Sequence, residues 1–286
     1  MDIKKVGVIG CGTMGGGIVQ TCAQSGYEVR VLEVTEPLLA KGLASIDRIL
    51  ANNVKKGKIT IQGKQDIQNR INGTLDINSF SDCDIVIEAA TEKLDVKKRI
   101  FAALDKICPP NTILATNTSC LSIIDMAIVT GRPDKVLGLH FMNPVPVMAL
   151  LEIIRTILTG EETLNVGRAF GLSLGKTIVE TKDEPGFIAN RLLMPFILNS
   201  IRMLENGFAS RDDIDKSIKL GLNHPLGPLA LADIIGLDTV YFIVSALYDE
   251  LKDPQYASPT MLKKMVAANW LGRKSGKGFY EYEKMV

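Results

Sequence analysis

Three glycines with the spacing G-x-G-x-x-G follow the first apolar run of the chain. They are Gly10, Gly12 and Gly15, with Thr13 and Met14 between the last two. In a strand–turn–helix unit, the first glycine permits a tight turn, the second lets the backbone approach a pyrophosphate, and the third lets the helix pack closely on the strand. The N-terminus of the following helix offers unpaired N–H groups and a partial positive charge to phosphates. The spacing therefore predicts a dinucleotide site.

A carboxylate in the expected place narrows the choice of dinucleotide. Glu33 closes the next apolar run, 27–32, and follows Gly10 by 23 positions, close to the spacing of about 20 that this motif uses. A carboxylate accepts hydrogen bonds from a ribose 2′-OH and repels a 2′-phosphate, so NAD is favoured over NADP. Arg30 is near in sequence, but strand alternation directs it away from Glu33.

One histidine and one glutamate could handle a proton beside such a cofactor. His140 ends the apolar run 136–140, and Glu152 is a lone carboxylate in the apolar run 150–154. A turn between two strands can bring them side by side, and a buried carboxylate needs such a partner. Taken alone, a histidine at a strand end is more often structural than catalytic. The dinucleotide motif and Glu152 favour an acid–base role here, whereas His224, with no obvious acidic partner, is expected to be structural.

The elements that must position these residues alternate along the first part of the chain. A helix is expected over 16–25, and 41–71 reads as a strand-free, charged helical insertion. The pattern predicts a doubly wound, mostly parallel α/β sheet of Rossmann type. Apolar strand candidates are 6–9, 29–32, 84–88, 112–116, 136–141 and 151–154.

Beyond about residue 184 the pattern becomes helical. Apolar periodicity predicts helices over 187–206, 212–222, 229–251 and 261–268. We therefore expect two domains: residues 1–184 as the Rossmann domain, and residues 185–286 as an all-helical domain, whose apolar surplus in 229–251 suggests a homodimer.

The composition limits the classes of protein to which this chain can belong. The 286 residues are 46% hydrophobic and 23% charged, with a net charge of +1. These values are those of an ordinary globular protein and give no electrostatic case for nucleic acid or a membrane surface as partner. Five cysteines without metal-like spacing suggest reduced thiols and no metal site. The absence of a signal peptide or a long apolar run favours the cytoplasm.

The whole chain resembles the short-chain L-3-hydroxyacyl-CoA dehydrogenases, and most closely the bacterial 3-hydroxybutyryl-CoA dehydrogenases among them. Six stretches carry the resemblance in the family order, and together they are very specific. They are residues 10–15 (GCGTMG), 117–119 (NTS), 140–148 (HFMNPVPVM), 183–191 (DEPGFIANR), 223–228 (NHPLGP) and 272–280 (GRKSGKGFY).

The resemblance implies roles for matching residues. His140 and Glu152 match the catalytic dyad, and Ser119 and Asn190 match the groups that hold the substrate oxygen. The implied cofactor contacts beyond the glycine turn are Glu33, Glu92, Lys97, Ser119, Asn143 and Lys274. The implied coenzyme A contacts are Lys56, Lys97 and Ser119, and the basic stretch 55–58 suits the phosphates of coenzyme A.

The expected activity is NAD-dependent oxidation of a short-chain (S)-3-hydroxyacyl-CoA, or the reverse reduction, by a homodimer or larger homo-oligomer. The chain departs from the family pattern at Met142, Ala149 and Cys120, which affects fine substrate preference and removes no implied catalytic group. The alternatives are a dehydrogenase of a free 3-hydroxy acid or sugar acid, such as an L-gulonate dehydrogenase, and a non-catalytic NAD-binding protein. Acyl-chain length and physiological direction stay open.

Overall fold

The computed structural model describes residues 2–283. The chain divides into two compact units, Met1–Glu184 and Pro185–Val286. Each unit is described by itself below.

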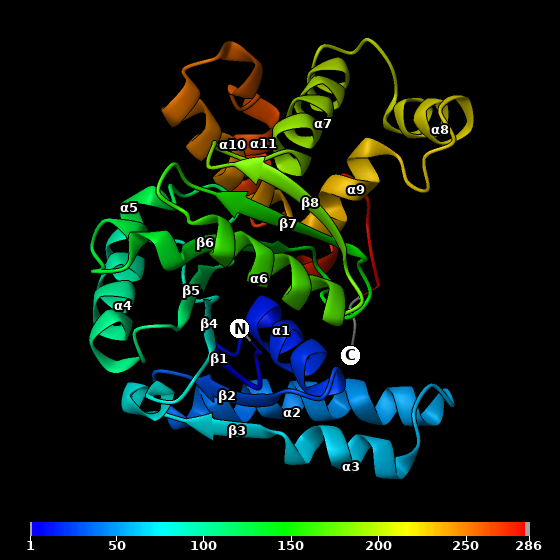
Figure 1. The fold of residues 1–286 in the computed structure, drawn as a ribbon. Helices are drawn as coiled ribbons and strands as arrows, with labels where there is room; N and C mark the ends of the chain where they lie inside the picture. The colour runs from blue at the N-terminus through cyan, green and yellow to red at the C-terminus, as the bar shows by residue number, and fades with distance from the viewer. Residues whose placement is uncertain (1, 284–286) are drawn as a thin grey trace. The chain divides into compact units, whose positions relative to one another are not determined.

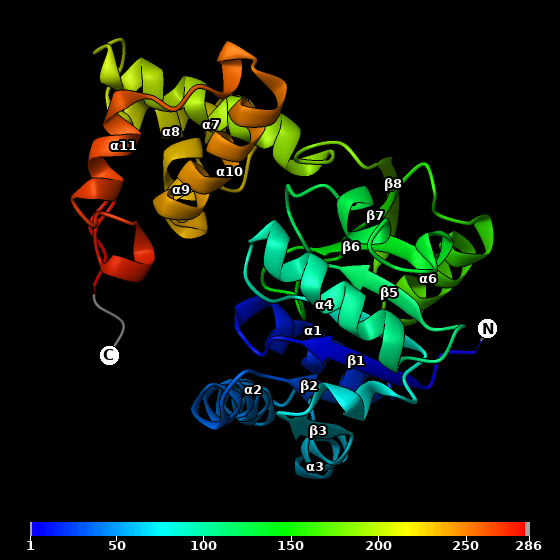
Figure 2. The ribbon, with the colours of Figure 1, turned by 90° about the vertical axis from the view of Figure 1, so that its left-hand side faces the viewer.

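The first unit is built on an eight-stranded sheet with the order β3-β2-β1-β4-β5-β6-β7-β8. Figure 1 labels these strands, and Figure 2 shows their succession from β3 to β8, with helix α4 crossing in front of the sheet. The order reverses between β1 and β4, which is where doubly wound sheets bind ligands. The strands are β1 (Lys5–Ile9), β2 (Glu28–Leu32), β3 (Ile71–Thr74), β4 (Ile85–Glu88), β5 (Ile113–Thr116), β6 (Val136–Phe141), β7 (Leu150–Arg155) and β8 (Thr177–Lys182).

All pairings in this sheet are parallel except that of β6 with β7. The central strands β4, β5 and β6 are buried along their whole length, as expected for strands covered by helices on both faces. The prediction of a doubly wound, mostly parallel sheet is confirmed, and each of the six predicted strands is present within two residues at either end.

Two strands escaped prediction because both lie at the edges of the sheet. The strands β3 and β8 contain no fully buried residue, so neither carries the apolar run that marks the central strands. The expectation that 41–71 is strand-free is wrong at its end, since β3 begins at Ile71. The rest of that stretch forms the crossover from β2 to β3, made of α2 (Glu36–Lys55) and α3 (Ile61–Asn69).

The other helices of the first unit connect the remaining strands. They are α1 (Thr13–Gln24), α4 (Leu94–Ile107), α5 (Ile124–Ala127) and α6 (Glu161–Ser173), with 3₁₀ turns η1 (Ile77–Phe80) and η2 (Pro133–Lys135). Apolar residues of α1 and α2, such as Ile18 and Ile46, join the strands in one core.

The second unit is helical in its described residues. Its helices are α7 (Ala189–Glu205), α8 (Arg211–Gly221), α9 (Pro228–Ile235), α10 (Leu237–Leu251) and α11 (Thr260–Ala267), with 3₁₀ turns η3 (Pro254–Tyr256) and η4 (Arg273–Ser275). The prediction of one long helix over 229–251 is wrong. Gly236 interrupts it with a φ of +99°, a conformation that glycine adopts without steric cost, and the chain bends by 95° there.

Within residues 2–283, no single helix is both long and apolar enough to cross a membrane. The bent pair α9 and α10 meets the length and composition criterion when its two helices are joined.

All five cysteines are buried and free. Burial raises the pKa of the Cys11 thiol to about 11 and that of Cys22 to about 12. The fraction of reactive thiolate at neutral pH is therefore very small at both positions.

The glycine turn after β1 shows why two of its glycines are needed by the fold. Gly10 has a φ of +93°. A Cβ atom on Gly15 would lie 1.9 Å from the carbonyl oxygen of Gly10, whereas a Cβ on Gly12 would meet no protein atom within 4 Å. Gly15 therefore serves the packing of α1 on β1, and Gly12 keeps a space open above the turn.

We predict that Gly15→Ala lowers the free energy of unfolding by at least about 1–3 kcal/mol, because the added methyl group must push the backbone apart. Gly12→Ala, the matched control, should unfold as the parent does. Urea denaturation followed by circular dichroism measures both. Equal stability of the two variants would contradict this role for Gly15.

Candidate active site

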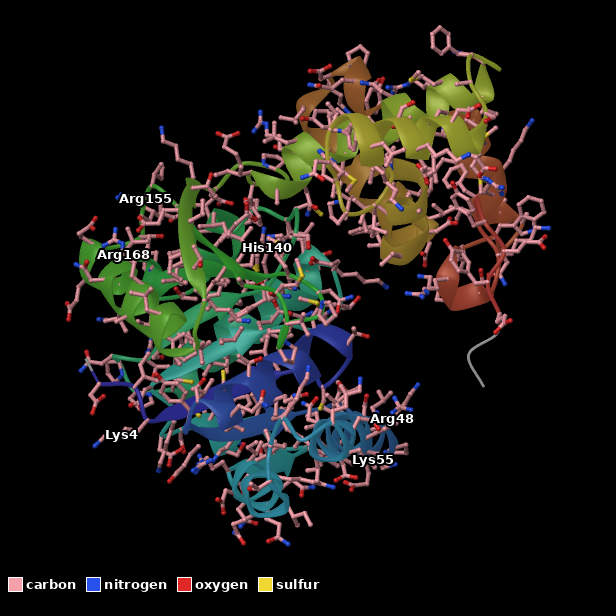
Figure 3. The ribbon with its side chains drawn as sticks, turned by 90° about the vertical axis from the view of Figure 1, so that its right-hand side faces the viewer. Lys4, Arg48, Lys55, His140, Arg155 and Arg168 are labelled. Atoms are coloured by element: carbon pink, nitrogen blue, oxygen red, sulfur yellow. The ribbon has the colours of Figure 1, made fainter. Side chains whose placement is uncertain are left out.

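His140 and Glu152 face one another across the only antiparallel pairing of the described sheet. They are direct register partners on β6 and β7, and His140 Nδ1 lies 2.7 Å from Glu152 Oε2. Figure 3 labels His140 among the strands of the first unit. Glu152 is completely buried and His140 is 4% exposed. The juxtaposition expected from a strand–turn–strand is therefore present.

The pairing fixes the tautomer of the imidazole. An ionised carboxylate can only accept a hydrogen bond, so Nδ1 of His140 donates to Glu152. In the neutral ring this leaves Nε2 without a proton and able to act as a base. Ser119, in the loop after β5, has its Oγ atom 3.1 Å from this Nε2. Base and hydroxyl thus lie together beyond the carboxyl ends of the sheet strands.

The loop that carries Ser119 is held by its neighbours. Asn117 accepts a hydrogen bond from the backbone N–H of Phe141 at 2.9 Å, which ties the end of β5 to the end of β6. Glu92 accepts hydrogen bonds from Thr118 Oγ1 at 2.9 Å and from the backbone N–H of Ser119 at 2.9 Å. Ser119 is therefore placed from both its backbone and its side chain.

Lys97 lies inside the first unit, next to two carboxylates. Its side chain is 1% exposed, and its ammonium is 2.7 Å from Glu88 Oε2 and 3.4 Å from Glu92 Oε2. Glu88, which ends β4, is completely buried. Lys97 thus faces Glu88 and Glu92 inside the unit.

The glycine turn has the features that a bound dinucleotide requires. Gly12 is the N-cap residue of α1, no side chain caps this helix, and its first turn contains no acidic residue, so its N–H groups are available to phosphates. The space above Gly12 is open. Glu33 follows β2, and its Oε1 accepts a hydrogen bond from Cys11 N at 2.6 Å. These residues fit NAD.

Arg30 is directed away from the turn, as strand alternation predicts. Its guanidinium donates to Asp82 and to the carbonyl of Ser79. Hydrogen bonds and ion pairs from Lys5 and Arg30 lower the pKa of Asp82 below its usual range in spite of partial burial. Arg30 is thus already neutralised by Asp82, and it does not offer a clamp for a 2′-phosphate.

A cavity of about 360 Å³ adjoins the glycine turn. Its walls are the turn with the start of α1, the helix α2, and the segment 143–146 that follows β6. Asn143, Glu33 and Lys41 are among its polar lining residues, while Leu38 and Ile49 contribute apolar surface. The cavity brings Asn143 to the same space as Gly12 and Thr13, in line with the cofactor role expected of it.

A buried lysine that sequence reasoning missed supports the segment after β6. Lys176 Nζ donates to the carbonyl oxygens of Val145 at 2.5 Å and Met148 at 2.8 Å, and burial lowers the pKa of this lysine. The helix α1 also contacts the segment, since a Cβ on Gly17 would lie 2.9 Å from Val145 Cβ. The segment is therefore held by α1 and by the lysine that precedes β8. A lysine directly before a strand gives no sequence signal of this role.

The remaining predicted residues lie elsewhere. Lys56 is exposed and directly follows α2, the helix on which Figure 3 labels Arg48 and Lys55. Asn190 and Lys274 belong to the second unit: Asn190 lies in the first turn of α7, and Lys274 lies in η4 with its Nζ 2.6 Å from Asp238 Oδ2. Among residues 2–283, no group of three or more His, Cys, Asp or Glu side chains could hold a metal ion.

Comparison with known proteins assigns both units to one family. Residues 5–184 match the NAD binding domain of 3-hydroxyacyl-CoA dehydrogenase, and residues 186–282 match its C-terminal domain. A probable 3-hydroxybutyryl-CoA dehydrogenase of Bacillus subtilis is 47% identical over 284 residues, which are 99% of each chain. The 3-hydroxybutyryl-CoA dehydrogenase of Clostridioides difficile is 45% identical over 98% of this chain and all of that protein.

A solved structure agrees with these matches. The crystal structure of (S)-3-hydroxybutyryl-CoA dehydrogenase PaaH1 from Ralstonia eutropha superposes with a TM-score of 0.94 at 44% identity, covering 99% of this chain and 100% of that chain. The chain described here belongs to the 3-hydroxyacyl-CoA dehydrogenase family.

Proposed function

We propose that this chain oxidises (S)-3-hydroxybutyryl-CoA, or another short-chain 3-hydroxyacyl-CoA, to the 3-ketoacyl-CoA with NAD, and catalyses the reverse reduction of acetoacetyl-CoA. The observation that carries the proposal is the buried His140–Glu152 pair with Ser119 on the opposite ring nitrogen. Relatives at 45–47% identity over nearly the full length carry the name 3-hydroxybutyryl-CoA dehydrogenase.

His140 is the proton acceptor in this proposal. Its Nε2 takes the proton of the C3 hydroxyl, and Glu152 stabilises the imidazolium that forms, since the carboxylate already accepts the Nδ1 hydrogen bond. Ser119 lies next to Nε2 and, with Asn190, orients the substrate oxygen. In the reduction, the same His140 returns the proton to the forming hydroxyl.

The glycine turn, the N-terminus of α1 and Glu33 would hold the cofactor, with Glu92, Ser119, Asn143 and Lys274 among the further contacts implied by the family. NAD, when bound, accepts the hydride that leaves C3 of the substrate. Glu33 is already oriented by Cys11 N, so its carboxylate is fixed at the end of β2 to meet a ribose hydroxyl. Lys56 and its basic neighbours on the α2 end serve the phosphates of coenzyme A.

We further propose that the protein acts as a cytoplasmic homodimer. Five free cysteines suit a reducing compartment. The helical unit exposes large apolar side chains, among them Leu192, Phe208 and Leu220 at 72%, 77% and 83%. Exposed apolar surface of this kind is typical of a protein interface, which supports this unit as the one that dimerises.

The substrate class is tested by comparing turnover of NADH with acetoacetyl-CoA, longer 3-ketoacyl-CoAs and free acetoacetate. We expect acetoacetyl-CoA to be reduced well and free acetoacetate poorly, because binding energy from the coenzyme A part is needed to orient the reacting carbon. With NADPH we expect a rate about 10²-fold lower, since Glu33 meets the 2′-phosphate with like charge. Faster turnover of the free acid would favour a free-acid or sugar-acid dehydrogenase instead. No turnover with any substrate, together with NADH binding, would favour a non-catalytic protein.

The acid–base role is tested by His140→Gln. We expect kcat to fall about 10²–10⁴-fold, the usual contribution of a general base, while NADH binding measured by fluorescence stays unchanged. Glu152→Gln should also lower kcat, because the imidazolium then lacks its counter-charge. The control is His224→Gln, since His224 belongs to the second unit, is exposed, and makes a tilted ring contact with Phe196 of the same unit. Near-normal turnover of His140→Gln would rule out this assignment.

A further inference from the structure

We propose that the buried ion pair of Glu88 and Lys97 is a positioning element of the active site, which sets the orientation of Glu92 and, through Glu92, the Ser119 loop. The proposal rests on the proposed function of this site. It gives Lys97 a role without ligand contact and adds Glu88 as a residue that acts on catalysis through others.

Glu88 is placed at the point where several structural elements converge. It ends β4, next to the reversal of strand order between β1 and β4, and it is completely buried. Its Oε1 accepts hydrogen bonds from Ala90 N at 2.8 Å and Lys97 Nζ at 2.9 Å. Its Oε2 accepts from Thr116 Oγ1 at 2.8 Å and Lys97 Nζ at 2.7 Å. The carboxylate is thus held by four contacts from three elements.

Lys97 is surrounded by acceptors of the protein itself. An ammonium has three N–H donors, and the three nearby acceptor oxygens are both oxygens of Glu88 and Oε2 of Glu92, the last at 3.4 Å. With 1% exposure of its side chain, Lys97 offers no surface to a cofactor or to coenzyme A in this conformation. Its positive charge instead faces Glu92, which is 29% exposed.

Hydrogen bonds continue this path from Glu92 to the histidine. Glu92 Oε1 accepts from the backbone N–H of Ser119 at 2.9 Å, and Ser119 Oγ lies 3.1 Å from His140 Nε2. A half-exposed glutamate would ordinarily sample several rotamers. The fixed charge of Lys97 favours the rotamer that holds Ser119.

The same pair also borders the cofactor side of the site. Glu88 fixes Ala90, and the adjacent Ala89 donates its N–H to the carbonyl of Ile9 at 2.8 Å. A Cβ on Gly10 would lie 2.7 Å from the carbonyl oxygen of Ala89, so this segment abuts the glycine turn. One buried ion pair therefore bears on both the loop of Ser119 and the edge of the dinucleotide site.

The test compares Glu88→Gln and Lys97→Met with a matched control, Lys98→Met. Lys98 is the next residue of α4 and also forms an ion pair at 3.0 Å, but its side chain is 30% exposed and its partner is Asp125 rather than Glu88 or Glu92. We expect kcat for acetoacetyl-CoA reduction to fall about 10–100-fold in the first two variants, because small misplacements of a reacting group cost rates of this order. The KM for acetoacetyl-CoA should stay within about twofold. The Kd of NADH should change by the same factor in Glu88→Gln and Lys97→Met, because both act on the cofactor side through Glu92 and Ala90, and Lys98→Met should match the parent.

Removing one partner leaves an uncompensated buried charge and can unfold the protein, so the double variant Glu88→Gln with Lys97→Met is made as well. It leaves no buried charge at this place. If the double variant has the unfolding temperature of the parent but a lower kcat, the pair positions the site. If both its unfolding temperature and its kcat equal those of the parent, the pair is merely structural and the proposal is wrong.

Two further results would overturn the proposal. A rise in KM or in the Kd of NADH in Lys97→Met, without such a rise in Glu88→Gln, would show that Lys97 contacts a ligand directly. Turnover of both single variants equal to that of Lys98→Met would show that the pair has no effect on the site. The proposed function itself fails separately, since it requires that the parent protein reduce acetoacetyl-CoA at all.

Discussion

The antiparallel pairing of β6 with β7 is the constraint on which the site depends. It makes His140 and Glu152 direct partners in an otherwise parallel sheet. A shift of one residue in this register would turn one of the two side chains to the opposite face of the sheet. The buried carboxylate would then have lost its partner, at a cost of several kcal/mol. The strand register therefore determines both the burial of the Glu152 carboxylate beside a partner and the tautomer of His140.

Three glutamates of the first unit, on or directly after the strands β2, β4 and β7, perform different tasks because their surroundings differ. Glu33 is partly exposed at the end of β2 and oriented by a backbone N–H, which suits it to meet a ligand. Glu88 is buried at the end of β4 and neutralised by Lys97, which suits it to fix a loop. Glu152 is buried on β7 and paired with a histidine, which suits it to share in proton transfer. The same side chain is thus a ligand contact, a positioning group or a counter-ion according to its partner.

The sequence was most informative where local physics and tertiary packing agree. The fully buried strand 136–141 reads as an unbroken apolar run, and the glycines of the turn are required by φ and by close approach, so both could be predicted. The edge strands β3 and β8 could not, because exposed strands have no apolar signature. The break at Gly236 could not be predicted either, since apolar residues continue on both sides of it.

Lys176 and the Glu88–Lys97 pair were missed for a related reason. Their roles depend on partners 9 to 31 residues away, and a single charge in an apolar run does not say which partner it meets.

The central claim is that the neutral ring of His140 carries its proton on Nδ1, held by Glu152, and that the unprotonated Nε2 accepts the substrate proton. Nitrogen NMR of the protein labelled with ¹⁵N-histidine tests it directly, because the two ring nitrogens give distinct signals and the chain has only two histidines. His224→Gln assigns the signals. The account predicts a protonated Nδ1 and an unprotonated Nε2 for His140 in its neutral form, with this preference lost in Glu152→Gln. A proton on Nε2 of the neutral ring in the parent protein would contradict it.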